Sequence, residues 1–425
     1  MEPNLLPVQE HIDLLLDGDA NDQPCDSCQS LDLEMNLPPW FDKEKYKRGQ
    51  QYIWKNLFAQ YGVTLCGLVC VLAVPSILKI LMGTKKSSTP MTAYRRYLST
   101  IKHVYAWYSD ELIPGTTSWK SLMTVRARHL RASKTSQRKG GGHISQRDLV
   151  LTQFSFYGFG LIRAKAIGMV CDNEEDIEGY VHFWRTVGYC MGIEDRYNLC
   201  RPSVQETREV TEAVCKEAFV QLLRNPPEYF FFMTTELING LWNFAPMITV
   251  KSYIYFTYNL AGVQGFYTSA ERKEGIKKGL HSPNPQKFNK LMQELRASSN
   301  GKIVNEKFIE GDDIFNALSW YDRFVLSLCF GLFSHYLANI FARIYFNSQI
   351  KLCMFLVTYF PFLVLFKFGF RNSFVDMFKE DITAEATAKT NKEILDTYSK
   401  VSDINHYDKV YNSCTTTVKV VKNAN

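Results

Sequence analysis

The chain has 425 residues, of which 46% are hydrophobic and 14% aromatic, and its formal net charge is +6. This length allows a sizeable core, and the high aromatic share suits a large apolar pocket, a membrane-contacting surface, or both. The basic residues are spread out apart from a small cluster at 134–139, so we find no nucleic-acid-binding footprint. The 11 cysteines have no regular spacing, which argues against a disulfide scaffold, and Cys25-x-x-Cys28 lacks a second pair at zinc spacing.

The first apolar segment follows a polar, acidic start. Residues 1–38 lack the apolar core of a signal peptide and are predicted to form a disordered or loosely docked arm. Residues 63–82 are long enough to span a bilayer, with Pro75 expected to kink the helix. The alternative is a buried core helix, which we favour.

Helical patterns dominate the middle of the chain. Residues 91–110 and 119–133 have helical periodicity, and three further helices are predicted from an N-cap followed by an acidic third position. These caps are Ser145 with Asp148, Asn173 with Asp176, and Ser203 with Glu206. Residues 250–258 are the one β-rich stretch and are equally compatible with a helix. Because other strand signals are scarce, the fold class is predicted to be all-α.

Composition divides the chain into five predicted parts. The acidic arm, 1–38, precedes a main helical domain at 39–262. A polar, basic insertion follows at 263–312. A hydrophobic helical part of the same domain is predicted at 313–380, and a polar tail at 381–425.

Histidine chemistry is what remains after the common catalytic motifs are excluded. The chain contains no G-x-S-x-G, H-E-x-x-H, P-loop or G-x-G-x-x-G sequence and no C-x-x-C-H for covalent haem attachment. Among its eight histidines, His129 shares a helix face with Arg126 and Ser133. A second helix places Arg96, Thr100, His103 and Trp107 on one face.

A haem needs an imidazole ligand, cations for its propionates and an apolar box, and these two helices offer such groups. The alternative is that both arginines form structural ion pairs and His129 is an ordinary histidine of the core or the surface.

Four short segments resemble a known family. The sequence from about residue 92 to 223 is similar to the catalytic domain shared by the fungal endoplasmic-reticulum-bound oxygenase mpaB and the bacterial rubber oxygenases, or latex-clearing proteins. The segments are RRYLST at 95–100, similar to the family's R-x-x-x-T helix, VRARH at 125–129, similar to its R-x-x-H, QRDLVLTQF at 146–154, and FWRTVGYCMGI at 183–193.

The resemblance implies an all-α, globin-like core that holds haem b, with His129 as the proximal iron ligand. It also implies that Arg96 and Thr100 lie on the other face of the haem and that Arg126 helps to hold the ligand helix. Rubber oxygenases can place a lysine on the sixth iron position just before the threonine, where this chain has Ser99. The sixth position is therefore expected to be open or water-filled, with His103 as a candidate to reach it.

The catalytic glutamate of the family has no counterpart here. The matching region, 79–81, reads Lys-Ile-Leu and contains no carboxylate. The leading functional hypothesis is a haem-dependent oxygenase that uses O2 on an apolar, alkene-bearing chain such as an isoprenoid or lipid. The alternatives are a catalytically impaired haem- or lipid-binding protein of the same fold, and a membrane-anchored structural protein without a cofactor.

Two later apolar runs, 324–341 and 352–366, indicate membrane contact. Both are short for spanning a bilayer, so helices lying on one leaflet or a hairpin dipping into it suit them better. Lys351, Lys367 and Arg371 near their ends suit contact with lipid head groups. We expect a membrane-associated protein, with the endoplasmic reticulum as a candidate location and the main body facing the cytosol. The alternative is that all these runs are core helices of a soluble fold.

Overall fold

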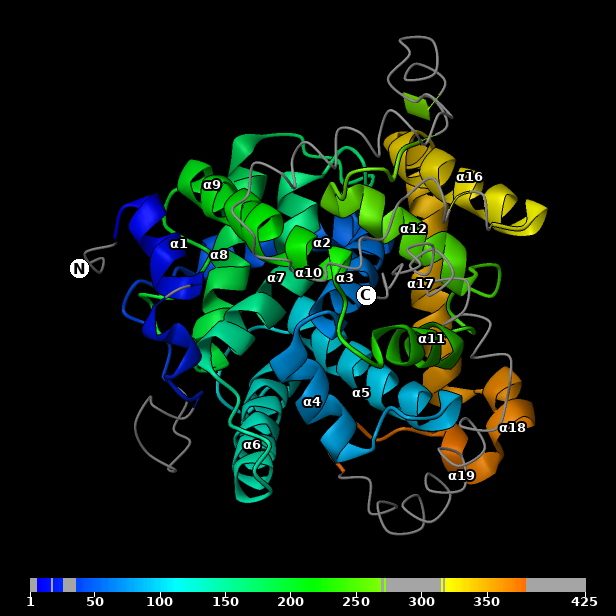
Figure 1. Ribbon diagram of the computed structural model, residues 1–425. Coiled ribbons are helices and arrows are strands. Elements are labelled where there is room, and N and C mark those ends of the chain that lie inside the picture. Colours follow the sequence, from blue (N-terminus) through cyan, green and yellow to red (C-terminus); the bar gives the residue numbers. More distant parts are fainter. Residues whose placement is uncertain are drawn as a thin grey trace, which may run out of the picture.

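Helices make up the fold in the computed structural model, which describes residues 6–16, 18–25, 36–268, 271–272, 315 and 318–379 (Figure 1). No strand occurs among these residues apart from an isolated bridge between Pro24 and Ser145, which confirms the all-α class. The N-terminal half consists of α1 (Val8–Leu16), the 3-10 turn η1 (Asp19–Asn21), α2 (Lys43–Lys55), α3 (Leu57–Leu72), α4 (Pro75–Thr84), α5 (Pro90–Ser109), α6 (Thr117–Arg138), α7 (Gln146–Ile162) and α8 (Glu174–Cys190). The remainder consists of α9 (Val204–Val214), the π turn η2 (Cys215–Phe219), α10 (Val220–Arg224), α11 (Phe230–Gly240), α12 (Val250–Ala261), α16 (Trp320–Ser334), the 3-10 turn η3 (Tyr336–Ala338), α17 (Ile340–Tyr359), α18 (Phe362–Phe368) and α19 (Phe370–Ser373).

The predicted helix starts are confirmed. The side chains of Ser145, Asn173 and Ser203 each accept a hydrogen bond from a backbone N–H of the first turn, at the N-termini of α7, α8 and α9. Such a bond satisfies a donor that the helix itself leaves unpaired. The stretch at 250–258 is helical, because Thr249 and Ser252 form a capping box that starts α12.

The apolar run at 63–82 is buried in the core, which was the favoured alternative to a membrane span. It is not one kinked helix. It is divided between α3, which ends at Leu72, and α4, which begins at Pro75. Proline lacks an N–H and suits the first turn of a helix, where that donor has no partner. Both helices contribute side chains to the core, among them Cys66 and Cys70 of α3 and Leu78 of α4.

The N-terminal arm differs from the expectation of disorder over the residues that the structure describes. His11, Ile12 and Leu15 of α1 are buried, and Arg201 hydrogen-bonds both His11 and the Leu6 carbonyl. Cys25 is also buried. Residues 1–5, 17 and 26–35, including Cys28, lie outside the described residues. So do most of the predicted insertion at 263–312 and the tail at 381–425, apart from the residues already given.

Two helix pairs form the tight centre of the fold. In α2 and α8, Gly49 and Gly179 face each other so closely that a Cβ on Gly49 would lie 2.2 Å from the Gly179 oxygen. In α3 and α7, a Cβ on Gly67 would lie 1.9 Å from the Ser155 oxygen. Glycine at these positions allows the two backbones to touch. The hairpin of α5 and α6 lies beside this centre, and α16 to α19 lie on the side of the molecule opposite α1 (Figure 1).

Candidate functional site

The α5–α6 hairpin brings the two predicted site helices together. A capping box of Thr89 and Thr92 starts α5, and Thr116 caps α6. The Ser121 hydroxyl accepts a hydrogen bond from Trp107 Nε1 at 2.8 Å and lies 2.7 Å from His103 Nδ1. The buried hydroxyl therefore joins two residues of α5 to α6.

His129 of α6 has the properties of a metal ligand. Its Nδ1 atom is buried and has no hydrogen-bond partner among the described residues. Burial, with the positive charge of Arg96 as a smaller cause, lowers the pKa of His129 from 6.5 to about 4. The imidazole is therefore neutral at pH 7, the form in which histidine binds metals.

The two predicted arginines are placed differently around His129. Arg96 of α5 is close enough to act on the His129 pKa, and its Nη1 donates to Thr84 Oγ1 of α4 at 3.2 Å. Burial lowers the pKa of Arg96. Arg126, one turn before His129, extends toward the C-terminal end of α8, where a Cβ on Gly192 would lie 3.5 Å from its Nε atom. That Nε atom is buried without a hydrogen-bond partner in the described part of the chain.

His103 offers no free ring nitrogen in this structure. Its Nδ1 atom meets Ser121, and its Nε2 atom lies 3.0 Å from Arg128 Nη1. Its side chain is buried, and burial together with the charge of Arg128 lowers its pKa to about 4. Access of His103 to an iron would require it to give up one of these contacts, so the structure gives no support to a sixth-ligand role.

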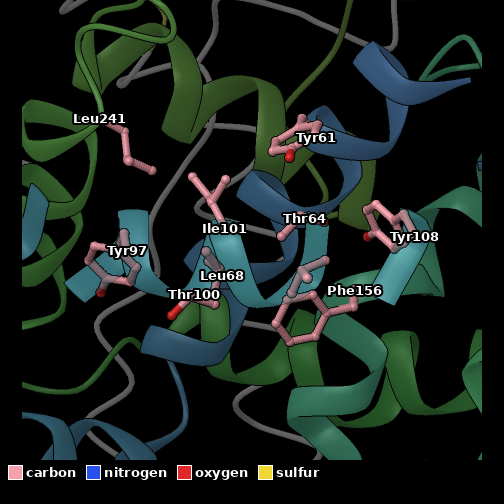
Figure 2. Close-up of a pocket in the computed structure, with 10 residues that line it drawn as sticks. Tyr61, Thr64, Leu68, Tyr97, Thr100, Ile101, Tyr108, Phe156 and Leu241 are labelled. Carbon is pink, nitrogen blue, oxygen red and sulfur yellow. The ribbon is translucent and has the colours of Figure 1, made fainter. Parts of the chain in front are cut away.

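Thr100 lines a small buried cavity of about 20 Å³, whereas Ser99 is half-buried and outside its lining. Figure 2 shows the cavity between α3 and α5, with α7 and the residue after α11 completing it. The lining residues are Tyr61, Thr64, Leu68, Tyr97, Thr100, Ile101, Val104, Tyr108, Phe156 and Leu241. Thr100 Oγ1 donates to the Arg96 carbonyl at 3.2 Å. This bond links the cavity wall to Arg96, whose side chain lies near His129.

Two tyrosine hydroxyls in this lining were not predicted from the sequence. Tyr61 and Tyr108 have buried hydroxyls with no hydrogen-bond partner among the described residues. Burial raises the pKa of both, so they stay protonated. The sequence pattern indicated part of this lining, because Tyr61, Thr64 and Leu68 share one face of α3. Which helix faces that side cannot be read from the spacing.

Polar residues of the segment 146–154 and the nearby His182 have structural contacts. Gln153 Nε2 donates to the Trp184 carbonyl and to Asn198 Oδ1, and Thr152 bonds back to Asp148 of its own helix. Neither lines the cavity. His182 is a satisfied core histidine, since its Nε2 accepts the Asp42 N–H at 3.0 Å.

Comparison with known proteins identifies a family that these helices resemble. The family model for the catalytic domain of the ER-bound oxygenase mpaB/B' and rubber oxygenase matches residues 52–237. This part of the chain is therefore similar to the catalytic domain of that family. The matched region includes α3 to α9 and therefore every predicted site residue. A rubber oxygenase from Streptomyces sp. (strain K30) is 27% identical over 234 residues, which cover 51% of this chain and 54% of the relative. The chain thus spans about half the length of the curated relative it matches.

A solved structure of latex clearing protein in the closed state also aligns. It is 18% identical, covers 68% of this chain and 87% of the other, and has a TM-score of 0.39.

The residues around His129 fit the donor set of a haem site. A neutral histidine with an unpartnered buried nitrogen and two nearby arginines supply an iron ligand and positive charge. The space does not yet fit, because a cavity of about 20 Å³ holds about one water molecule. Pockets for small-molecule ligands measure roughly 300–1,000 Å³, and neither His129 nor either arginine lines this cavity, so a haem at His129 would need space that the cavity does not provide.

Proposed function

We propose that this protein is a haem b-dependent oxygenase that acts on an apolar, alkene-bearing substrate of the isoprenoid or lipid class. The single observation that carries the proposal is the neutral His129, whose Nδ1 is buried and has no partner among the described residues, inside a domain similar to the oxygenase family. When bound, haem supplies the redox chemistry by which O2 reacts. The endoplasmic-reticulum location and the cytosol-facing body stay predictions.

The chain's own residues would prepare this chemistry. His129 would hold the iron, because its lowered pKa leaves no proton to compete with the metal. Arg96 and Arg126 would supply positive charge beside the cofactor. Leu68, Ile101 and Phe156 give the cavity an apolar wall, which would suit a hydrocarbon chain if the surrounding helices moved apart.

A second candidate is a haem- or lipid-binding protein of this fold that has lost catalysis. It is favoured by the cavity lining, which contains hydroxyls but no carboxylate. The sequence lacks the family's catalytic glutamate at the matching position, and no residue that lines the cavity replaces it.

Haem binding is tested with the full chain and His129→Ala. We expect the purified full chain to have a Soret band that His129→Ala loses, while His182→Gln, which alters another buried histidine, retains it. A Soret band of unchanged position and height in folded His129→Ala would refute the ligand assignment.

Catalysis is tested separately on the haem-loaded protein. Oxygen uptake and formation of oxygenated products from squalene, used as a model isoprenoid chain, are the expected results. Haem binding without oxygen uptake on any isoprenoid or unsaturated lipid would favour the second candidate.

A further inference from the structure

The N-terminal half of α17 buries polar side chains and exposes apolar ones, which is the reverse of a helix on a water-facing surface. Arg343 and Asn347 are buried: Arg343 Nη1 donates to the Leu337 carbonyl at 3.2 Å, and Asn347 Oδ1 accepts the Phe58 N–H at 2.9 Å. The outward side is mostly apolar, with Ser348 and Lys351 as exposed polar residues, and Phe341 is 78% exposed. In water this arrangement leaves apolar area unburied, so it indicates that something other than water covers α17.

The exposed apolar side chains of α16 to α19 form a surface that we call the outer face. Trp320 is 80% exposed and Phe366 is 86% exposed. The other members are Tyr321, Phe324, Leu328, Tyr336, Ile340, Phe341, Ile344, Tyr345, Leu352, Phe355, Leu356, Tyr359, Phe360, Phe362, Leu363, Phe370 and Phe374. Isolated apolar side chains are normal on a protein surface, but a run over four neighbouring helices marks an interaction site. The helices lie together along one side of the molecule (Figure 1).

Apart from Asp322 in the first turn of α16, all the charged residues of α16 to α19 carry a positive charge. Between Asp322 and Asp376 the sequence contains no aspartate or glutamate, and its charged side chains are Arg323, Arg343, Lys351, Lys367 and Arg371. Lys351, Lys367 and Arg371 are exposed. The Lys351 Nζ atom lies 4.9 Å from the centre of the Trp54 ring, and the Lys367 Nζ atom lies 4.6 Å from that of Trp242. Cations and aromatic rings at the edge of an apolar surface suit the head-group region of an anionic membrane.

The anchoring of α17 favours a helix that lies against the protein rather than one that crosses a bilayer alone. By length and composition, α17 is the one helix among the described residues that qualifies as a span, and α2 with α3 qualifies only as a pair bent by 92°. However, its buried stripe runs along the whole helix, through Arg343, Asn347, Ile350, Met354 and Val357. Asn347 Nδ2 donates to the Lys55 carbonyl at 2.8 Å, which fixes the stripe to the end of α2.

We propose that the outer face docks into one leaflet of a membrane that contains anionic lipid. Buried polar contacts hold α17 to the body, the aromatic and aliphatic side chains enter the leaflet, and the cations meet the head groups. The inference does not depend on haem or on catalysis, so it stands or falls separately from the proposed function.

The first test is flotation of the full chain with vesicles of phosphatidylcholine alone and of phosphatidylcholine mixed with phosphatidylserine. We expect binding to both and stronger binding to the anionic vesicles. The double variant Phe341→Ser/Phe366→Ser should weaken binding roughly 100-fold, about tenfold for each phenylalanine removed. The matched control is Ile113→Ser, because Ile113 is an exposed apolar residue of the α5–α6 connection, outside the outer face. It should bind as the unaltered chain does.

The second test separates the contribution of charge to vesicle binding from that of the apolar side chains. Lys351→Gln/Arg371→Gln should reduce binding to the anionic vesicles about 25-fold, roughly fivefold for each cation, with little effect on phosphatidylcholine vesicles. The control, Arg138→Gln/Lys139→Gln, removes the same charge at the far end of α6 and should leave binding unchanged.

Three outcomes would overturn the proposal. One is a full chain that stays in the soluble fraction with both kinds of vesicle. Another is a stable dimer, measured by sedimentation without vesicles, that the phenylalanine variant dissociates, since the outer face would then be an interface between two copies. The third is vesicle binding that both phenylalanines leave unaffected.

Discussion

At the scale of single residues, the candidate site is distinguished by which buried histidine nitrogens have hydrogen-bond partners and which do not. His103 was expected near the iron because it shares a helix face with Arg96 and Thr100. In the structure its two nitrogens are occupied by Ser121 and Arg128. The contrast with His129, whose Nδ1 has no partner among the described residues, supports the proposal that His129 is the ligand.

Ser121→Ala tests the structural role of the His103 contact. The substitution leaves Trp107 Nε1 and His103 Nδ1 buried without their partner, and each unsatisfied group costs about 1–3 kcal/mol. We expect the free energy of unfolding, measured with urea, to fall by at least about 2 kcal/mol. Thr124→Ala, one turn later on α6, removes a hydroxyl that bonds only to its own helix at Lys120, so a change below about 0.5 kcal/mol is expected. Equal effects of the two substitutions would contradict this assignment.

At the scale of helices, close backbone contact decides which pairs form the centre of the fold. The α2–α8 contact has no room for a side chain at Gly49, where a Cβ would also lie 2.7 Å from the Phe183 Cβ. Sequence patterns predicted where most of these helices begin, but they gave no indication that these glycines face one another.

Gly49→Ala is therefore expected to lower the free energy of unfolding by about 1–3 kcal/mol, because the two backbones must move apart. Gly83→Ala is the matched comparison, since a Cβ on this α4 residue meets nothing within 4 Å. Alanine is the better helix former, so Gly83→Ala should be neutral or stabilising by up to about 1 kcal/mol. Thermal unfolding of both variants distinguishes the cases, and a stabilised Gly49→Ala protein would show that the contact is looser than described.

At the scale of the whole molecule, two buried histidines link distant parts of the chain. His11 holds α1 against Arg201, and His182 accepts a hydrogen bond from Asp42 at the start of α2. Burial lowers the pKa of each from 6.5 to about 4. The unfolded chain binds the proton of each histidine more tightly than the folded chain does. The neutral histidines therefore contribute their full stabilisation above pH 6.5, and this stabilisation is lost as the pH falls toward 4.

The free energy of unfolding should therefore decrease by up to about 1.4 kcal/mol per pH unit for each histidine between pH 6.5 and 4. In His11→Asn/His182→Asn this part of the slope should disappear. Urea unfolding at a series of pH values measures it, and an identical slope in the double variant would mean that neither histidine is held neutral by the fold.

The sequence by itself determined the helical class, most helix starts and the family-like motifs around His129, because these depend on residues within one or two turns of each other. Cap residues next to apolar periodicity satisfy local donors whatever the rest of the chain does. Only the tertiary structure decided the remainder: the division of 63–82 at Pro75, the docking of α1, the occupied nitrogens of His103 and the cavity with Tyr61 and Tyr108. It also decided that Arg343 and Asn347 turn inward while their apolar neighbours turn outward. Each of these outcomes depends on which helix packs against which, and neighbouring residues in the sequence do not encode that choice.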